Sequence, residues 1–182
     1  MSGPTASACA WVGRLLAGVS VVMSSGCVFD VGSRVDGPLT AGDVSVRNEV
    51  CLTAIEGGPV TVGIDIATNT GADDLLVDGI ELINPEGLDL EYASLREIDG
   101  NMIGAQTAFP PLSAPGLSAE ADGHTWPIQP GEELGIVVGL QPTDRLGTAD
   151  AIRISYQTPD GDPYFAATST SIVVVNDPPA TC

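Results

Sequence analysis

The feature that most constrains this chain is a run of strict two-residue alternation. Val60, Val62, Ile64 and Ile66 alternate with small or polar residues, and this spacing places the four aliphatic side chains on one face of a strand. Asn69-Thr70-Gly71 follows, with residues that favour a turn. A strand with one apolar face has to be covered by another layer of structure. Because the sequence contains no convincing helical run, the pattern predicts an antiparallel β architecture.

The same alternation recurs along the rest of the chain, with short turn sequences between the segments. Asn84-Pro85-Glu86-Gly87 and Pro159-Asp160-Gly161-Asp162 predict tight turns, the second within a hairpin. We predict seven strands, near residues 44–53, 60–67, 76–83, 88–92, 134–140, 152–156 and 164–175. Seven short strands joined by Gly- and Pro-containing turns favour a two-sheet sandwich. The expected fold is therefore all-β, an Ig-like antiparallel β-sandwich of about seven strands in residues 43–182.

One long segment, residues 99–126, breaks this rhythm. Its prolines make a helix or a central strand improbable, and loops of this length in compact domains are often functional. Phe109, His124 and Trp126 are its candidate ligand-binding residues. Two plainer interpretations stay open: Trp126 closes the end of the core, and His124 is a lone exposed or packing histidine.

Several short motifs in the predicted sandwich carry a family resemblance. The Asn69-Thr70-Gly71 turn, Ile80, the Pro130-Gly131 turn and Tyr156 together resemble the bacterial Ig-like modules grouped with abnormal-spindle and hydin domains. The resemblance implies a sandwich fold and a role in adhesion or scaffolding. It carries no catalytic residues to transfer.

The N-terminus resembles a bacterial lipoprotein signal peptide. Behind Arg14, the stretch Leu15–Cys27 is an apolar run that ends in Ser24-Ser25-Gly26-Cys27. An apolar run of about nine residues is too short to cross the bilayer permanently but suits the apolar region of an export signal. The resemblance implies that a helical signal peptide, residues 1–26, is cleaved and that the Cys27 thiol is lipidated. Ordinary signal cleavage and a retained anchor are the alternatives.

The remaining cysteines fit an exported protein. If Cys9 leaves with the signal peptide and Cys27 carries lipid, Cys51 and Cys182 remain, and two cysteines in an exported protein usually pair. A pair of buried or unlinked thiols is the alternative. Residues 27–42 are rich in Asp, Gly, Ser and Pro, which predicts a flexible tether between the lipid and the domain.

Charge excludes some classes of partner. All 24 acidic residues follow the signal peptide, with five of the six arginines, so the mature chain carries a net charge of 5 − 24 = −19. Such a surface repels nucleic acid and anionic lipid headgroups. The expected partners are the membrane, through the lipid on Cys27, and a protein, glycan or cell-wall component, with no nucleic acid.

Catalytic motifs are not found in the sequence. It contains no Gly-x-Ser-x-Gly nucleophile elbow, phosphate loop or dinucleotide fingerprint, and His124 is its single histidine. Asp160 and Asp162 are a candidate fragment of a calcium site, with a solvated acidic turn as the alternative.

We therefore expect a non-catalytic surface lipoprotein on the extracytoplasmic face of a bacterial cell membrane, with no cofactor required. The alternative is a carboxylate-based or calcium-dependent extracytoplasmic enzyme or binder.

Overall fold

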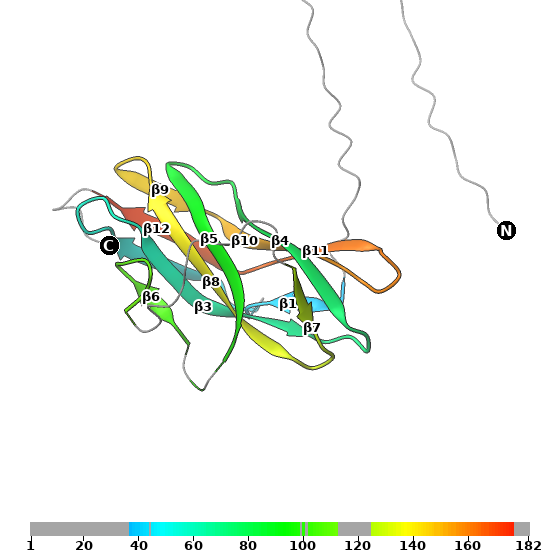
Figure 1. The fold of residues 1–182 in the computed structure, drawn as a ribbon. Coiled ribbons are helices and arrows are strands. Elements are labelled where there is room, and N and C mark those ends of the chain that lie inside the picture. The colour runs from blue at the N-terminus through cyan, green and yellow to red at the C-terminus, as the bar shows by residue number, and fades with distance from the viewer. Residues whose placement is uncertain (1–36, 44, 99, 101, 113–124, 177–182) are drawn as a thin grey trace, which may run out of the picture.

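The computed structural model describes residues 37–43, 45–98, 100, 102–112 and 125–176. These residues form twelve strands and no helix (Figure 1). The strands are β1 (Leu39–Ala41), β2 (Asn48–Thr53), β3 (Val60–Asn69), β4 (Leu75–Ile83), β5 (Leu88–Glu97), β6 (Gly104–Gln106), β7 (Trp126–Ile128), β8 (Glu133–Pro142), β9 (Leu146–Ala149), β10 (Ala151–Gln157), β11 (Pro163–Ala167) and β12 (Thr170–Val175).

The strands make three sheets. The first has the order β1-β3-β8-β5, with β6 also paired to β3. The second has the order β11-β10-β4-β7, and the third the order β2-β12-β9. Every pairing is antiparallel except that of β2 with β12, which is parallel.

One long bent hairpin joins the second and third sheets. The chain passes from β9 to β10 at Asp150 and returns from β11 to β12 at Thr168 and Ser169. Across the bend, the Thr168 amide donates to the Ile152 carbonyl over 2.9 Å and the Ile152 amide donates to Thr168 Oγ1 over 3.0 Å. These bonds satisfy backbone groups where the ladder is interrupted.

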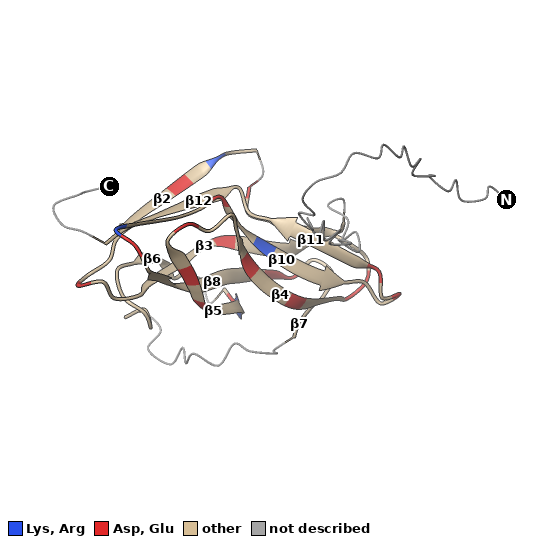
Figure 2. Ribbon diagram, turned by 90° about the horizontal axis from the view of Figure 1, so that it is seen from above, with Lys and Arg blue, Asp and Glu red and all other residues tan. Residues whose placement is uncertain are grey.

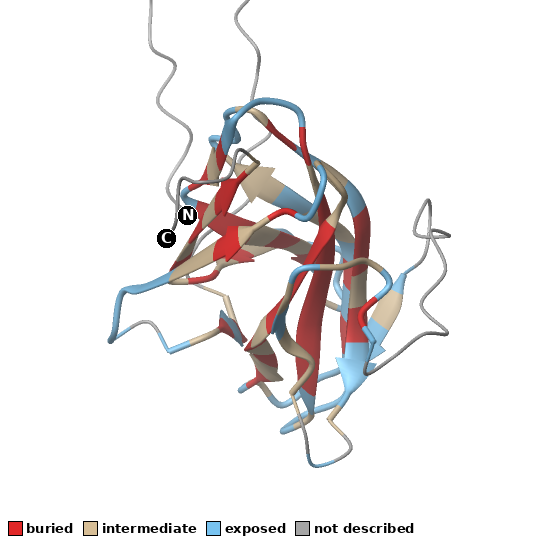
Figure 3. Cartoon of the chain, turned by 90° about the vertical axis from the view of Figure 1, so that its left-hand side faces the viewer, coloured by how far each residue is buried: buried red, intermediate tan, exposed pale blue. Residues whose placement is uncertain are grey.

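The two joined sheets face the first sheet across one core. Buried aliphatic side chains from all three sheets belong to a single cluster, among them Val138 from β8, Ile154 from β10 and Ile172 from β12. Buried residues run through the strands of the domain (Figure 3). Along much of β10 and β12 they alternate with more exposed residues, whereas β8 is buried over most of its length. The described chain is thus an Ig-like β-sandwich, as predicted, with one of its two layers bent into two sheets.

The strand count and one boundary differ from the prediction. The expected strand 164–175 is broken into β11 and β12, and four short strands, β1, β6, β7 and β9, lie where we predicted tether or loop. The domain boundary at residue 43 is wrong because β1, within the expected tether 27–42, pairs with β3. Leu39 and Ala41 are 3% and 1% exposed, so this end of the expected tether is part of the core.

Asn69 holds the turn that the sequence predicted. Its side-chain Nδ2 donates to the carbonyl oxygens of Asp73 and Ile128 over 2.8 and 2.9 Å, and Oδ1 accepts from the Gly71 amide over 2.9 Å. The backbone carbonyl of Asn69 accepts from the Gly131 amide over 2.8 Å. One buried amide therefore connects the β3–β4 turn to β7 and to the β7–β8 turn.

Candidate functional site

Residues 102–112, which we call the strap, cross the outer face of the first sheet. The strap contains β6, which pairs with β3 from Thr61↔Gln106 to Gly63↔Gly104. Thr61 Oγ1 donates to the Ala108 carbonyl over 2.6 Å, and Gln106 Oε1 accepts from the Leu112 amide over 3.0 Å. Part of the expected loop 99–126 is thus fastened to the sandwich by backbone and side-chain hydrogen bonds.

Two glycines in the sheet let the strap approach closely. A Cβ on Gly139 of β8 would lie 2.7 Å from the Phe109 ring, and one on Gly63 of β3 would lie 3.0 Å from Ile103 Cβ. Both distances are tighter than ordinary van der Waals contact. Glycine inside a strand often marks such a close approach. The absence of a side chain at Gly63 and Gly139 therefore lets the strap pack directly against the sheet.

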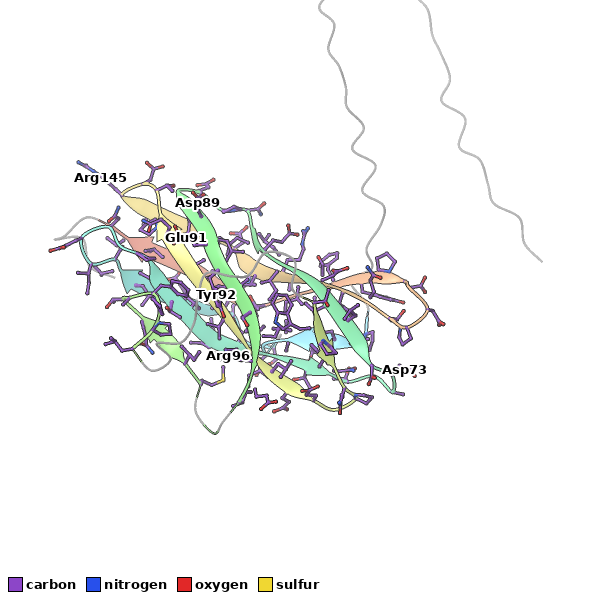
Figure 4. The ribbon with its side chains drawn as sticks, viewed as in Figure 1. Asp73, Asp89, Glu91, Tyr92, Arg96 and Arg145 are labelled. Carbon is purple, nitrogen blue, oxygen red and sulfur yellow. The ribbon has the colours of Figure 1, made fainter. Side chains whose placement is uncertain are left out.

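The strap closes a second, smaller apolar cluster. Tyr92 of β5 and Val137 of β8 are buried beneath Ile103 and Phe109. Tyr92 lies near the middle of β5 in Figure 4, and its ring centroid is 5.1 Å from that of Phe109, with the two planes inclined at 40°. Since Val137 alternates with the main-core residue Val138, the small cluster lies on the opposite face of the sheet. Phe109 is consequently an anchor of the strap rather than a freely presented side chain.

The end of the strap is exposed. Leu112 has 88% of its surface accessible, the largest exposed fraction among the described large hydrophobic residues, and Pro110 is also exposed. A segment held by hydrogen bonds and packing therefore presents an apolar side chain immediately before residues 113–124, which lie outside the described part of the chain.

The structure separates Trp126 from Phe109, because the two side chains pack in different apolar clusters. Trp126 lies on β7 opposite Val77 of β4, half-buried and packed against the main core. This placement supports the interpretation that Trp126 closes the core. His124 lies outside the described residues.

The candidate calcium residues lie at the tip of the β10–β11 hairpin, as the turn sequence predicted. Asp160 and Asp162 are both exposed there, and the Gly161 amide donates to the Thr158 carbonyl over 2.8 Å. Among the described residues, no group of three or more His, Cys, Asp or Glu side chains is arranged to hold a metal ion. Acidic residues are instead distributed over several elements of the sandwich (Figure 2).

One buried carboxylate has a hydrogen-bond partner for only one of its two oxygens. Asp65 of β3 is 5% exposed, and its Oδ1 accepts from Thr170 Oγ1 over 2.9 Å. Its Oδ2 is buried and has no hydrogen-bond partner. Burial raises the pKa of Asp65, and the Thr170 hydrogen bond opposes this change. Gly42 packs closely against this carboxylate, since a Cβ on Gly42 would lie 2.8 Å from Asp65 Oδ1.

Of the cysteines, only Cys51 is described. It lies on β2 and is disulfide-bonded to a partner outside the described residues. Cys27 and Cys182 lie outside the described residues as well, so the predicted lipidation and the predicted pairing stay predictions.

Comparison with known proteins adds little to this geometry. No protein-family model and no curated protein matches the sequence. Among solved structures, the chain is similar to the ASH/PapD-like domain 7 of human CEP192, with a TM-score of 0.41, 7% identity, and coverage of 77% of this chain and 85% of that one. It is also similar to the Vibrio cholerae VesB protease, with a TM-score of 0.39 and 14% identity over 76% of this chain. The match covers 32% of the protease, so the chain spans about a third of its length.

The residues that sequence reasoning missed are the strap's supports, Gly63 and Gly139. Each interrupts an otherwise aliphatic strand, which is a signal of close backbone approach. Nothing in the sequence names the segment that approaches, because Phe109 is 30 residues from Gly139 along the chain.

Proposed function

We propose that this protein is a surface lipoprotein, held by a palmitate-type lipid on Cys27 at the extracytoplasmic face of a bacterial cell membrane. The apolar stretch Leu15–Cys27 supports the export signal and the lipid anchor. Residues 28–36 then act as the tether, because Gly37 and Pro38 already contact the domain ahead of β1. No helix in the described ranges is long and apolar enough to cross a membrane.

The anchored domain is a non-catalytic binding or scaffolding module. The observation that carries this proposal is the strap, whose anchored body ends in the 88% exposed side chain of Leu112. Contiguous exposed apolar surface can mark an interaction site, and Pro110 and Leu112 offer such surface at the end of the strap. The binding surface comprises the exposed part of the strap, at Pro110 and Leu112.

The charge of the domain narrows the class of partner. A mature chain with 24 acidic residues and five arginines disfavours nucleic acid and anionic lipid. The partner is therefore a protein, a glycan or a cell-wall component that tolerates an acidic surface. No cofactor is needed for such a role.

Fractionation of cells tests the anchor. Cys27→Ala removes the proposed lipid acceptor, so we expect the protein to move from the membrane to the soluble or secreted fraction and to lose labelling by an alkyne fatty acid. Cys9→Ala is the matched control, because Cys9 lies in the part that is removed. A membrane fraction unchanged by Cys27→Ala would overturn the lipid anchor.

Crosslinking in intact cells tests the binding surface. A photoreactive phenylalanine analogue at Leu112 should capture a partner in a discrete crosslinked band. The control position is Leu76, which is 41% exposed on β4 of the other layer. Equal capture at both positions, or none at Leu112, would contradict binding through the strap.

A further inference from the structure

The third sheet has an outer face, and no strand of the described residues forms a layer over its apolar side chains. Leu52, Ile172 and Val174 point into the core, so the residues that alternate with them point outward. Cys51 lies opposite Val173 in the register of β2 and β12, and Val173 lies opposite Thr148 of β9. We call Cys51, Thr148, Val173, Val175 and Leu146 the outer row.

The outer row is apolar for a surface, and it is unevenly covered. Leu146 is 55% exposed and Val173 is half-buried, whereas Val175 is only 7% exposed. The covered end of the row is the point at which β12 ends and the last six residues, 177–182, continue the chain. We call these six residues the C-terminal tail.

The disulfide of Cys51 indicates what reaches this face. Its partner lies outside the described residues, which leaves Cys9, Cys27 and Cys182. Asn176 is three residues beyond Val173, or about 10 Å along the strand. The tail spans up to about 20 Å, so Cys182 reaches Cys51 with chain to spare.

Cys27 is much less well placed. It precedes Gly37 by ten residues, which span at most about 33–36 Å. Gly37 lies against Tyr156 and Tyr164, and Tyr164 is nine residues from Val173 along the bent β11–β12 segment, up to about 30 Å. Crossing that whole span would use nearly the full extended length of residues 27–37. Cys9 is excluded by the proposed leader cleavage. The preference for Cys182 over Cys27 follows from chain length and does not depend on that cleavage.

We propose that the C-terminal tail folds back over the outer row and is locked there by a Cys51–Cys182 disulfide. Pro178 and Pro179 lack backbone N–H groups and favour extended backbone. They suit a segment that lies across a sheet face rather than one that adds a strand. Their rings and Ala180 supply apolar surface to Val173 and Leu146.

Formation of the Cys51–Cys182 disulfide is a two-electron oxidation. The two thiols lose two protons and two electrons to an external disulfide, which is reduced to two thiols. The exported location proposed above supplies such disulfide donors. Since the bond would join the segment that follows β12 to β2, it would fasten the parallel β2–β12 pair at the edge of the third sheet.

Peptide mapping tests the pairing on the mature, oxidised protein. Trypsin cuts after Arg47, Arg96 and Arg153, so Cys51 lies in peptide 48–96 and Cys182 in peptide 154–182. We expect these two peptides to be joined before reduction and separate after it. Linkage of peptide 48–96 to the peptide ending at Arg34 identifies Cys27, and linkage to the peptide ending at Arg14 identifies Cys9. Either result overturns the proposal, and the second also contradicts leader cleavage.

A pair of glutamate substitutions tests the position of the tail. Val173→Glu places a charge under the tail and beside the terminal carboxylate, so we expect the disulfide to be reduced about tenfold more readily in a glutathione buffer. Ser171→Glu is the control, on the same face of β12 but two residues farther from the tail. Equal effects of the two substitutions would overturn docking of the tail on the outer row. The Cys51–Cys182 pairing would still be decided by the peptide mapping. Cys51→Ser and Cys182→Ser should each lower the melting temperature by about 5–15 °C, and the double variant by no more.

Discussion

The backbone amide of Leu39 donates a hydrogen bond to the Tyr156 hydroxyl over 3.2 Å, and so joins the first strand of the domain to the opposite layer. Tyr156 is 1% exposed, and a Cβ on Gly37 would collide with its hydroxyl oxygen. The segment that leads from the proposed lipid into the domain is therefore tied into the core at its entry. Tension on the tether would act on this contact together with the two hydrogen bonds that Thr70 donates to the Pro38 carbonyl.

Tyr156→Phe should lower the free energy of unfolding by about 1–3 kcal/mol, because the buried Leu39 amide loses its acceptor. Chemical denaturation measures the loss. Tyr92→Phe is the matched control, since no hydrogen bond of its hydroxyl is found among the described residues, and it should change stability by less than about 0.5 kcal/mol. Equal losses would contradict a specific role for the Leu39–Tyr156 bond.

The same tyrosine predicts behaviour at alkaline pH. Burial raises the pKa of Tyr156, so the unfolded chain loses the phenolic proton at lower pH than the folded chain. This contribution to stability is full below the unfolded pKa, about 10, and is lost as pH rises through the folded pKa. Tyr156→Phe should remove that alkaline decline, whereas an unchanged decline would assign it to other groups.

Asp65 should make the folded state less stable as the pH rises. Its folded pKa is raised by burial, so its contribution is greatest below the unfolded pKa, about 3.9, and declines as pH rises through the folded pKa. Asp65→Asn should flatten this part of the profile of unfolding free energy against pH. Thr170→Val removes the hydrogen bond that favours the charged form, and should extend the decline to higher pH. A wild-type profile that rises with pH over this window in comparison with Asp65→Asn would contradict the assignment.

Asn69→Ala should destabilise the domain by about 2–4 kcal/mol, because the buried carbonyl of Ile128 and the amide of Gly71 each lose a partner. Thermal and chemical unfolding measure the effect. Asn48→Ala is the control, at an exposed position with no side-chain hydrogen bond among the described contacts. If both variants unfold alike, the turn does not depend on the Asn69 side chain.

Gly139→Ala should displace the strap, since the new Cβ would lie 2.7 Å from the Phe109 ring. We expect a loss of about 1–3 kcal/mol and faster hydrogen exchange in residues 102–112. Gly135→Ala in the same strand meets no atom closer than 3.7 Å, so it should be neutral or slightly stabilising. Faster exchange with Gly135→Ala, or none with Gly139→Ala, would contradict the glycine contact.

Prediction from sequence succeeded where a pattern is local and failed where a partner is distant. The strand β3 and the Pro159–Asp162 hairpin turn were predictable, because alternation and turn residues act over a few neighbours. The prediction that Ile66 shares the face of Val60 and Val62 was wrong, because a register shift between Val62 and Asp65 brings Ala67 into the core instead. The strand β1 was missed, because a three-residue segment has no periodicity to detect. Its place depends on Leu39 finding a site in the core and a bond to Tyr156.

The candidate site divides in the same way. Sequence indicated that residues 99–126 are unlike the rest of the chain and that Phe109 and Trp126 are its large apolar side chains. The tertiary structure placed Phe109 in the strap's small cluster and Trp126 against the main core, which no local signal distinguishes.

The sequence alone determined a β-sandwich with an acidic surface, because alternation decides which side chains leave water and composition decides the charge. The tertiary structure alone decided that a strap crosses the outer face and that Asp65 is buried beside Thr170. Contacts between segments far apart in the chain depend on shape and packing across the whole molecule, and no window of neighbouring residues contains that information.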